Sequence, residues 1–420
     1  MSPISKRTLA VVISIVIVVA AVGTLALLQL PPFGPAAPPK DEIVIGMSIS
    51  LTGKYATPGT FQLQGVQLWV KDVNADGGIL VDDYGKKLPV RLVYYDDKSE
   101  KETAVRLAEK LIDEDKVDVL FGPYGSALTF SVAPIAEARK TLMISIMGSS
   151  DKIFAQGYEY VIQLLTPGSH YLRGTLDLVK AKDPTATRVA ALYADDAFST
   201  VAGQGAVAYA EELGLEVVYN ETYPKDITDF SSILISLKAT NPDVIVGGGH
   251  YEDGILLCRQ LKEMDVNAKA IGILVAVPIP AFREDLGPDA EYILGPSQWE
   301  PGVQYVPDFG PTPAEFFSSF EAEFGVEPEY RAASGYGAGL LAQKLIVEAG
   351  TLAGESLRQK AGELEFTTFW GEFKIDPETG LQVGHDMVVM MWIGGERYIV
   401  WPPAAAETDP VYPKPPWGGA

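Results

Sequence analysis

The sequence predicts an α/β fold of two lobes, each a parallel sheet flanked by helices. Strand-like and helix-like runs alternate along the chain, and most strand-like runs are almost continuously apolar, as parallel strands covered on both faces are. This alternating series occurs once before about residue 165 and once after it. A chain of 420 residues is also too long for one ordinary core, so two lobes with tails are expected.

The first series begins at residue 41. Predicted strands over 43–50 (IVIGMSIS) and 90–97 (VRLVYYDD) enclose a helix that ends at VNADGG. Ser99 and Glu102 have the spacing of a capping box, which predicts the start of the next helix. The loops after the strands VDVLFG and MISI are rich in Gly and Ser, so backbone N–H groups and hydroxyls are available there to a small ligand.

The second series starts near Pro167 and has the same character. After it, helical runs are expected from about Pro313, Ala332 and Gly354, followed by a hairpin formed by EFKID, the turn PETG and VGHDMVVMMWIGG. A Pro-rich extended tail, which Trp401 and Trp417 would dock onto a lobe, is predicted over 403–420. The predicted elements of the second series alternate helix and strand over 170–182, 188–195, 198–213, 215–223, 229–239, 243–249, 251–264 and 268–274.

The N-terminal part predicts export from the cytoplasm. Lys6 and Arg7 precede an uncharged apolar run over 9–28, which is long enough for one membrane-spanning anchor. Positive charge on the short side predicts that residues 1–8 stay in the cytoplasm and that the rest lies outside. A cleaved signal sequence is the alternative, and it also gives an extracytoplasmic protein. Residues 29–40 are Pro-rich and predict a semi-rigid stalk.

Composition excludes several classes of function. A net charge of −22 argues against nucleic-acid binding, which needs clustered Lys and Arg. Cys258 allows no internal disulfide, and its helical surroundings predict a core position. His170, His250 and His385 are far apart in the sequence and lack metal-ligand spacing, so neither a metal site nor a cofactor is predicted.

Several motifs resemble the type I periplasmic solute-binding proteins of ABC importers, of the leucine/isoleucine/valine-binding class. The most specific are the opening strand with its S-x-T-G loop, VNADGGI, the YYDD-x-S strand end, FGPYGSA and MISIMGSSD. The resemblance covers residues 41–402 and implies a ligand-binding protein whose two lobes close on a solute. The permease subunits would then recognise the closed form. Three crossovers would join the lobes, near Leu164, Ser297 and Phe373.

The resemblance also implies lobe boundaries. Lobe I would hold 41–164 plus 297–373, and lobe II would hold 165–296 plus 374–402. The loops facing the cleft between them would supply the ligand contacts, and no catalytic residue is expected.

Four candidate ligand-binding residues lie in lobe I. Ser126 follows the Gly-rich turn FGPYGSA near a helix start, where its hydroxyl and nearby N–H groups suit an anion, although a plain capping role is the alternative. The resemblance implies that Ser126 binds a carboxylate, and that Met147, Gly148 and Ser149 hold the head group of an amino acid. Met147 departs from the small residue of the family, so it affects the predicted pocket size.

Two candidates lie in lobe II. The resemblance implies that Phe198 covers the ligand and that His250 replaces a tyrosine of the family; a core phenylalanine and a surface histidine are the alternatives. The family's acidic partner for a ligand ammonium is missing from the stretch 272–280. Either a nearby acid replaces it, or the ligand is no zwitterion, since a buried ammonium without a partner costs several kcal/mol. The acids considered are Asp195, Asp196, Glu252 and Asp253.

The sequence thus predicts the substrate-binding subunit of an ABC importer for a branched-chain amino acid or a related small polar solute. A ligand-binding sensor for amides or small carboxylates is an alternative. An amide hydrolase is a weaker one, because no nucleophile and base are paired in the sequence and GxSxG is absent.

Overall fold

The structure is a computed structural model that describes residues 39–418. The predicted anchor over 9–28 and nearly all of the predicted stalk lie outside this range. Among the helices of the described part, none is both long and apolar enough to cross a lipid bilayer. Residues from Asp41 onward form one compact unit, and the following account concerns that unit.

Within the described residues, the first sheet has five parallel strands in the order β4-β1-β5-β6-β7. Every residue of the strand β1 is buried, because helices cover both faces of the sheet. Two small antiparallel pairs, β2 with β3 and β13 with β14, lie outside it. The strands named here are β1 (Ile43–Ile49), β2 (Ile79–Val81), β3 (Lys86–Leu88), β4 (Val90–Asp96), β5 (Val119–Phe121), β6 (Met143–Ser145), β7 (Val161–Gln163), β13 (Phe366–Thr368) and β14 (Gly371–Phe373).

The helices around this sheet come from both ends of the described chain. The early ones are α2 (Ala56–Ala75), α3 (Lys101–Asp113), α4 (Ser126–Ala138) and the short α5 (Asp151–Phe154). The late ones are α11 (Pro313–Phe324), α12 (Tyr330–Ala349) and α13 (Gly354–Glu363).

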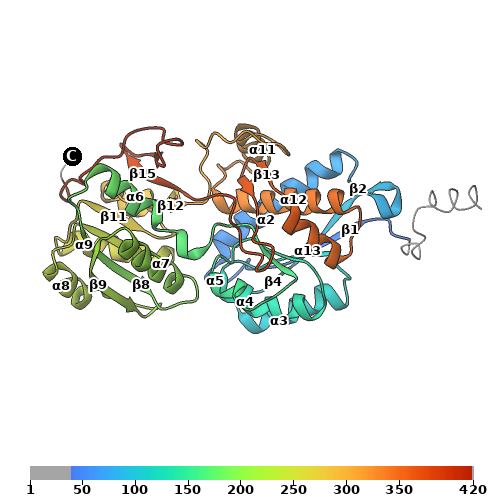
Figure 1. The fold of residues 1–420 in the computed structure, drawn as a ribbon, viewed down its shortest axis with the longest axis horizontal. Coiled ribbons are helices and arrows are strands. Elements are labelled where there is room, and N and C mark those ends of the chain that lie inside the picture. Colours follow the sequence, from blue (N-terminus) through green and yellow to red (C-terminus); the bar gives the residue numbers. More distant parts are fainter. Residues whose placement is uncertain (1–38, 419–420) are drawn as a thin grey trace, which may run out of the picture. The chain divides into compact units, whose positions relative to one another are not determined.

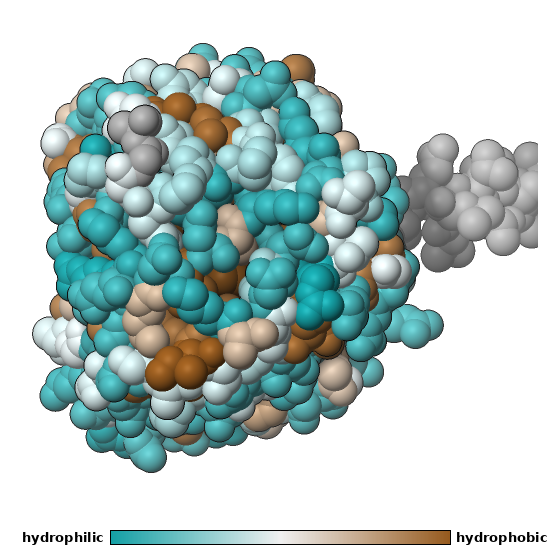
Figure 2. Space-filling model, turned by 90° about the vertical axis from the view of Figure 1, so that its left-hand side faces the viewer, coloured by the Kyte–Doolittle hydropathy of each residue, from teal (hydrophilic) through white to brown (hydrophobic). Residues whose placement is uncertain are grey.

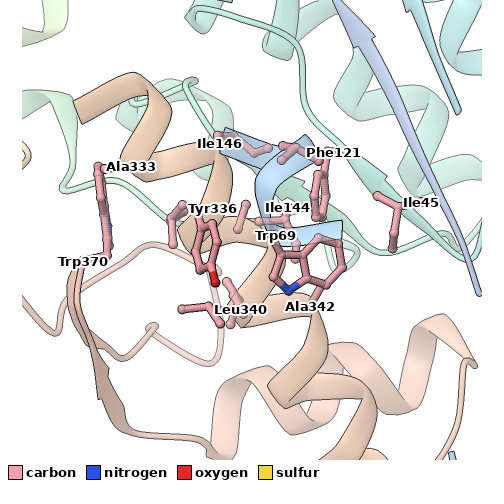
Figure 3. Close-up of a cluster of buried hydrophobic side chains, with 14 of the residues drawn as sticks. Ile45, Trp69, Phe121, Ile144, Ile146, Ala333, Tyr336, Leu340, Ala342 and Trp370 are labelled. Carbon is pink, nitrogen blue, oxygen red and sulfur yellow. The ribbon is translucent and has the colours of Figure 1, made fainter. Parts of the chain in front are cut away.

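Helix α12 packs directly against α2 in the core of this lobe. A Cβ added at Gly65 would lie 1.9 Å from the carbonyl oxygen of Ala332, so the two helix backbones meet where no side chain fits. Figure 3 shows Tyr336 of α12 beside Trp69 of α2, with Phe121 and neighbouring strand residues behind them. Because α12 is enclosed, its N-terminal half has no exposed face.

In the described range the second sheet has seven strands in the order β16-β15-β12-β11-β10-β8-β9. The run from β12 to β9 is parallel, and β15 and β16 add antiparallel strands at one edge. Alternate residues of β8 face two different cores, with Ala191 and Tyr193 on one side and Leu192 on the other. The strands are β8 (Arg188–Ala194), β9 (Glu216–Tyr223), β10 (Val244–Gly248), β11 (Ala270–Ile273), β12 (Leu294–Ser297), β15 (Val388–Ile393) and β16 (Glu396–Trp401).

Five helices flank this second sheet in the described part of the chain (Figure 1). The first four follow the predicted series closely, with ends displaced by a few residues at most, whereas the fifth was not predicted. Their bounds are α6 (Arg173–Lys182), α7 (Ser199–Glu212), α8 (Ser231–Ala239), α9 (Tyr251–Glu263) and α10 (Ala281–Leu286). The prediction of an α/β fold with parallel sheets flanked by helices is confirmed.

Two local predictions are wrong. Ser99 does not cap α3: its φ is 62°, its hydroxyl donates to the carbonyl of Thr52 at 2.8 Å, and Glu100 is the residue at the cap position. The predicted arm VGHDMVVMMWIGG contains β15, but β15 forms its hairpin with β16 and not with EFKID, whose Ile375 makes only an isolated bridge to Gln382. Gly394 and Gly395 both have positive φ, which suits a two-residue hairpin turn better than PETG does.

The C-terminal segment lies on the second lobe as far as it is described. Nε1 of Trp417 donates to the carbonyl of Val266 at 2.7 Å, and Nζ of Lys414 donates to Oδ1 of Asn267 at 3.1 Å. Trp401 belongs to β16 and not to the tail. The face of the molecule in Figure 2 is largely hydrophilic with small separate hydrophobic patches, as is ordinary for an exposed surface.

Candidate ligand-binding cleft

The strand order of each sheet defines a place where a ligand can bind. In the first sheet the chain moves from β1 to its neighbour β4 and then to β5 on the other side, so the loops after β1 and β5 diverge. These two loops carry Tyr55 and Tyr124. In the second sheet the corresponding loops follow β8 and β10, and they carry Asp196 and His250. Open parallel sheets bind ligands at such divergence points.

The four residues meet around one cavity of about 770 Å³. The ring centroids of Tyr55 and Tyr124 lie 5.2 Å apart, and those of Tyr55 and His250 lie 5.8 Å apart. Because Tyr55 follows a strand of the first sheet and His250 follows a strand of the second, residues of both sheets form the walls. Val275 and Ile279 add apolar surface, and Arg331 adds a cation.

Tyr55 and Tyr124 are held in place by the starts of helices. Tyr55 precedes α2, and its backbone N–H donates to Oγ of Ser99 at 3.1 Å. Tyr124 precedes Gly125, whose φ of 82° lets the chain turn sharply into α4. Burial, together with the neighbouring Tyr124 and Asp196, raises the pKa of Tyr55 well above its ordinary value, so its hydroxyl stays a hydrogen-bond donor.

Arg331 lies at the first turn of α12 and is buried. Its Nη1 donates to Oε2 of Glu329 at 2.6 Å, and its Nε donates to the hydroxyl of Tyr124 at 3.3 Å. The guanidinium also lies over the ring of Tyr330, 4.2 Å from its centroid. Burial opposes the charge, but Glu329, Tyr330 and Tyr124 together outweigh that effect and raise the pKa of Arg331, so the guanidinium is protonated.

The wall from the second sheet is built by two helix starts. Oδ1 of Asp196 accepts from the backbone N–H groups of Phe198 and Ser199 at 2.8 and 2.9 Å, which fixes the start of α7. The backbone N–H of His250 donates to Oδ1 of Asp253 at 2.8 Å at the start of α9. Nε2 of His250 is 3.6 Å from Oδ2 of Asp196, so the two helix starts contact each other.

Aromatic rings continue from the cavity into the second lobe. The ring of Phe198 lies 6.0 Å from that of His250 and packs edge-on at 4.9 Å against Tyr171. Burial raises the pKa of Tyr171 to about 12, and its hydroxyl hydrogen-bonds the side chains of Ser149 and Gln298. Phe198 therefore lies between His250 at the cavity wall and the buried Tyr171.

Of the residues predicted for the site, His250 lines the cavity and Phe198 packs directly behind it. The other four cluster at the ends of β5 and β6, and each already has a partner within the chain. Oγ of Ser126 accepts from the N–H of Ser150 at 3.1 Å, and Sδ of Met147 accepts from the hydroxyl of Ser334 at 3.2 Å. The carbonyl of Gly148 accepts from Oγ of Ser145 at 2.9 Å, and that of Ser149 accepts from the N–H of Gly168 at 2.6 Å.

Three residues of the cavity were missed by the sequence reasoning. Tyr55 and Tyr124 lie in loops that were predicted to face the ligand, but only small and hydroxyl residues of these loops were predicted to bind it. Arg331 is the one strong charge in the otherwise uncharged run YRAASGYGAGLLA, which was a usable signal. Asp196 was considered only as a partner for an ammonium group.

The acids that were considered as replacements take different positions. Asp196, Glu252 and Asp253 line the cavity, whereas Asp195 does not. Among residues 39–418, no group of three or more His, Cys, Asp or Glu side chains is arranged to hold a metal ion. The cleft is thus built from rings, one buried guanidinium and partly buried carboxylates, a set that suits a small organic molecule with polar ends.

Comparisons with known proteins agree with this arrangement. Residues 42–396 match the sequence model of a family described as periplasmic binding protein. The Leu/Ile/Val-binding protein homolog 7 of Brucella abortus (strain 2308) is 23% identical over 394 residues, which cover 89% of this chain and 95% of that protein.

Two solved structures are similar to this one. A leucine-binding protein from Thermotoga maritima superposes with a TM-score of 0.73 at 23% identity, covering 84% of this chain and 97% of that one. A solute-binding protein of an ABC transporter from R. palustris, solved in complex with benzoate, gives a TM-score of 0.69 at 21% identity, covering 88% and 98%. With its α/β sheets and inter-sheet cavity, the chain belongs to the periplasmic binding protein family.

Proposed function

We propose that this chain is the extracytoplasmic substrate-binding subunit of an ABC importer, which captures an amino acid of the branched-chain type or a related small polar solute. The observation that carries the proposal is the cavity of about 770 Å³, whose walls come from the loops after β1 and β5 of one sheet and after β8 and β10 of the other. A site built this way is complete only when the two lobes are close together, so ligand binding favours closure.

The proposed lobes are 41–164 plus 297–373 and 165–296 plus 374–402. In support, the buried core around the first sheet draws mainly on the first pair of segments, and the two cores around the second sheet draw on the second pair. The crossovers proposed near Leu164, Ser297 and Phe373 coincide with the ends of β7, β12 and β14.

The proposed ligand is small and has both an apolar body and a polar head. Rings of Tyr55, Tyr124 and His250 supply apolar contact, and Arg331 supplies a charge-assisted donor. The similarity to a leucine-binding protein and to a benzoate complex suits a ligand of this size.

We also propose that the ligand contacts four residues at the base of the cleft, namely Ser126, Met147, Gly148 and Ser149. Ser149 supports this role, because it bonds Tyr171, which packs against Phe198 and so connects these strand ends to His250. Reaching them would require the ligand to displace partners such as the N–H of Ser150.

Membrane attachment through residues 9–28 is a further part of the proposal and rests on the sequence alone. The mature protein should then sediment with membranes, and protease added outside should release a fragment cut within 31–40. A mature protein that begins after about residue 26 would show that the segment is a cleaved signal sequence instead.

Small-angle scattering and thermal unfolding test the binding function together. We expect leucine, isoleucine or benzoate to lower the radius of gyration and to raise the melting temperature with increasing concentration, as mass action requires. An unchanged scattering curve and melting temperature across a broad panel of amino acids, amides and carboxylates would refute the proposal.

A further inference from the structure

Arg331 brings a buried guanidinium with unused donors to the wall of the cavity. It is 2% exposed and lies in the first turn of α12, a helix of 20 residues. Its Nε and Nη1 bond Tyr124 and Glu329. Nη2 is also buried, and it has no hydrogen-bond partner among residues 39–418. The two N–H groups of that nitrogen therefore lack an acceptor in the described part of the chain, and they belong to a side chain that lines the cavity.

A carboxylate is the ligand group that best matches these donors. A buried, charged donor without an acceptor is unfavourable, and a planar guanidinium pairs with a planar carboxylate through strong charge-assisted hydrogen bonds. The N-terminus of α12 adds partial positive charge at the same place. Glu329 accepts a hydrogen bond from Nη1 of Arg331, and Nη2 has no acceptor within the described residues. A second carboxylate can therefore bind the same guanidinium through Nη2.

The partly buried acids of the cavity, by contrast, are already engaged. Both oxygens of Asp196 accept hydrogen bonds from the start of α7: Oδ1 from two N–H groups, and Oδ2 from the hydroxyl of Ser199 at 2.8 Å. Asp253 accepts from the N–H of His250 and from the hydroxyl of Tyr223. The other carboxylates that line the cavity are exposed, where water hydrates them; they are Asp226, Glu252 and Asp285.

The positively charged side chains of the cavity also differ in their exposure. Lys54, Lys225 and Arg259 are exposed, whereas Arg331 is enclosed. Close to Arg331, the ring of Tyr124 is 5% exposed and packs against Tyr55. The deep part of the cavity therefore combines one positive donor with aromatic surface.

We infer that the cleft ligand is a small organic carboxylate that needs no amino group, its carboxylate bound by Nη2 of Arg331 and its apolar body held between the rings of Tyr55, Tyr124 and His250. This inference rests on the proposed function, because it assigns a ligand class to the same cleft. The inference also explains why 272–280 contains no acidic partner, because such a ligand carries no ammonium group to neutralise.

Titration calorimetry of the purified full-length protein with four defined probes tests the ligand class. Isocaproate is leucine without its amino group, isocaproamide is its neutral counterpart, and leucine and benzoate complete the panel. We expect isocaproate or benzoate to bind at least as tightly as leucine and at least about tenfold more tightly than isocaproamide. Leucine binding with no binding of isocaproate or benzoate would overturn the inference.

Variants test the role of Arg331. Arg331→Gln should weaken carboxylate binding by roughly ten- to a hundredfold while changing isocaproamide binding by much less. Because this change leaves Glu329 buried without its partner, the double variant Glu329→Gln/Arg331→Gln, which removes both charges, serves as the second test. Arg358→Gln is the matched control, since Arg358 is half-buried with an unpartnered Nε but does not line the cavity.

The outcomes separate this inference from the proposed function. If the parent protein closes on an amide or on leucine but binds no deaminated carboxylate, the receptor function stands and the carboxylate assignment fails. If the double variant melts like the parent and binds carboxylates with unchanged affinity, Arg331 is not the carboxylate site. If no solute in the panel of the scattering experiment binds, both fail together.

Discussion

The backbone N–H of Thr166 donates to Oε1 of Gln298 at 3.1 Å, and Nε2 of Gln298 donates back to the carbonyl of Thr166 at 3.4 Å. Thr166 follows β7 of the first sheet, and Gln298 follows β12 of the second, so the pair joins two of the segments that connect the sheets. The hydroxyl of Thr166 donates to the carbonyl of His385 at 3.2 Å, which ties in the segment between β14 and β15. The connecting segments are therefore bonded to one another.

Replacing Gln298 with methionine tests the strength of this connection. The change keeps the volume of the side chain but leaves the buried N–H and carbonyl of Thr166 without partners, which should lower the free energy of unfolding by about 1–3 kcal/mol. Denaturant unfolding followed by circular dichroism measures the difference. Gln304→Met is the matched control: this glutamine is exposed, and its replacement should cost less than about 0.5 kcal/mol. Equal losses for both variants would argue against a structural role for the pair.

His385 should make stability depend on pH. Burial lowers its pKa, while its Nδ1 donates to the carbonyl of Glu372 at 2.7 Å, and its charged neighbour is Asp386. The hydrogen bond with His170 lowers the pKa of Asp386, so this carboxylate stays ionised near neutral pH. The unfolded chain then binds more protons than the folded one below about pH 6.5, so the free energy of unfolding falls as the pH falls through that value. Above it, the contribution of His385 is fully present.

The comparison of the parent protein with His385→Gln checks this contribution. Urea unfolding at several pH values between neutral and mildly acidic should give a shallower fall in the free energy of unfolding for the variant. Parallel curves for the two proteins would mean that His385 keeps the same pKa in the folded and unfolded states.

The fold was predictable because its signals are local and repeated. Nearly continuous apolar runs such as IVIGMSIS and DVIVGGG, separated by helical runs, indicate parallel strands, and the chain length indicates two lobes. The residues at which helices and strands begin and end were harder to predict. Ser99 has the right spacing for a capping box, but its hydroxyl bonds Thr52, a residue remote in the sequence. Such competition between local and distant partners is invisible in a single sequence.

The candidate site was only partly predictable for a related reason. The divergence of loops at the edge of each sheet could be expected, and it led to the FGPYGSA turn, to Phe198 and to His250. The face of the helix 330–349 that meets the cleft depends on how α12 packs against α2, where Gly65 and Gly335 let the backbones touch. Without that packing, Arg331 could not be assigned to the same cavity as Tyr55.

His250 provides a test of the lid. Its ring lies between Tyr55 across the cleft and Phe198 behind it, so under the proposed function it would cover the ligand only when the lobes are closed. His250→Ala should therefore raise the dissociation rate of benzoate or leucine by about tenfold and leave the association rate nearly unchanged. Stopped-flow measurement of tyrosine and tryptophan fluorescence follows both rates. His170→Ala is the control, because both histidine side chains are 30% exposed and His170 does not line the cavity. A change confined to the association rate would contradict a lid.

The docked C-terminal segment should contribute to the stability of the second lobe. The indole of Trp417 packs against the core that contains Cys258, its Nε1 donates to the carbonyl of Val266, and Nζ of Lys414 lies 3.7 Å from the centre of its ring. Trp417→Phe removes the hydrogen bond but keeps most of the apolar contact, so it should cost about 1 kcal/mol in the free energy of unfolding. Trp417→Ala also removes the partly buried ring and should cost about 2–4 kcal/mol. Because burial lowers the pKa of Lys414 to about 8, this lysine is deprotonated in the folded state at a lower pH than in the unfolded chain, and the free energy of unfolding should rise between about pH 8 and 10.5. If Trp417→Ala and the parent unfold at the same denaturant concentration, the segment lies on the lobe without stabilising it.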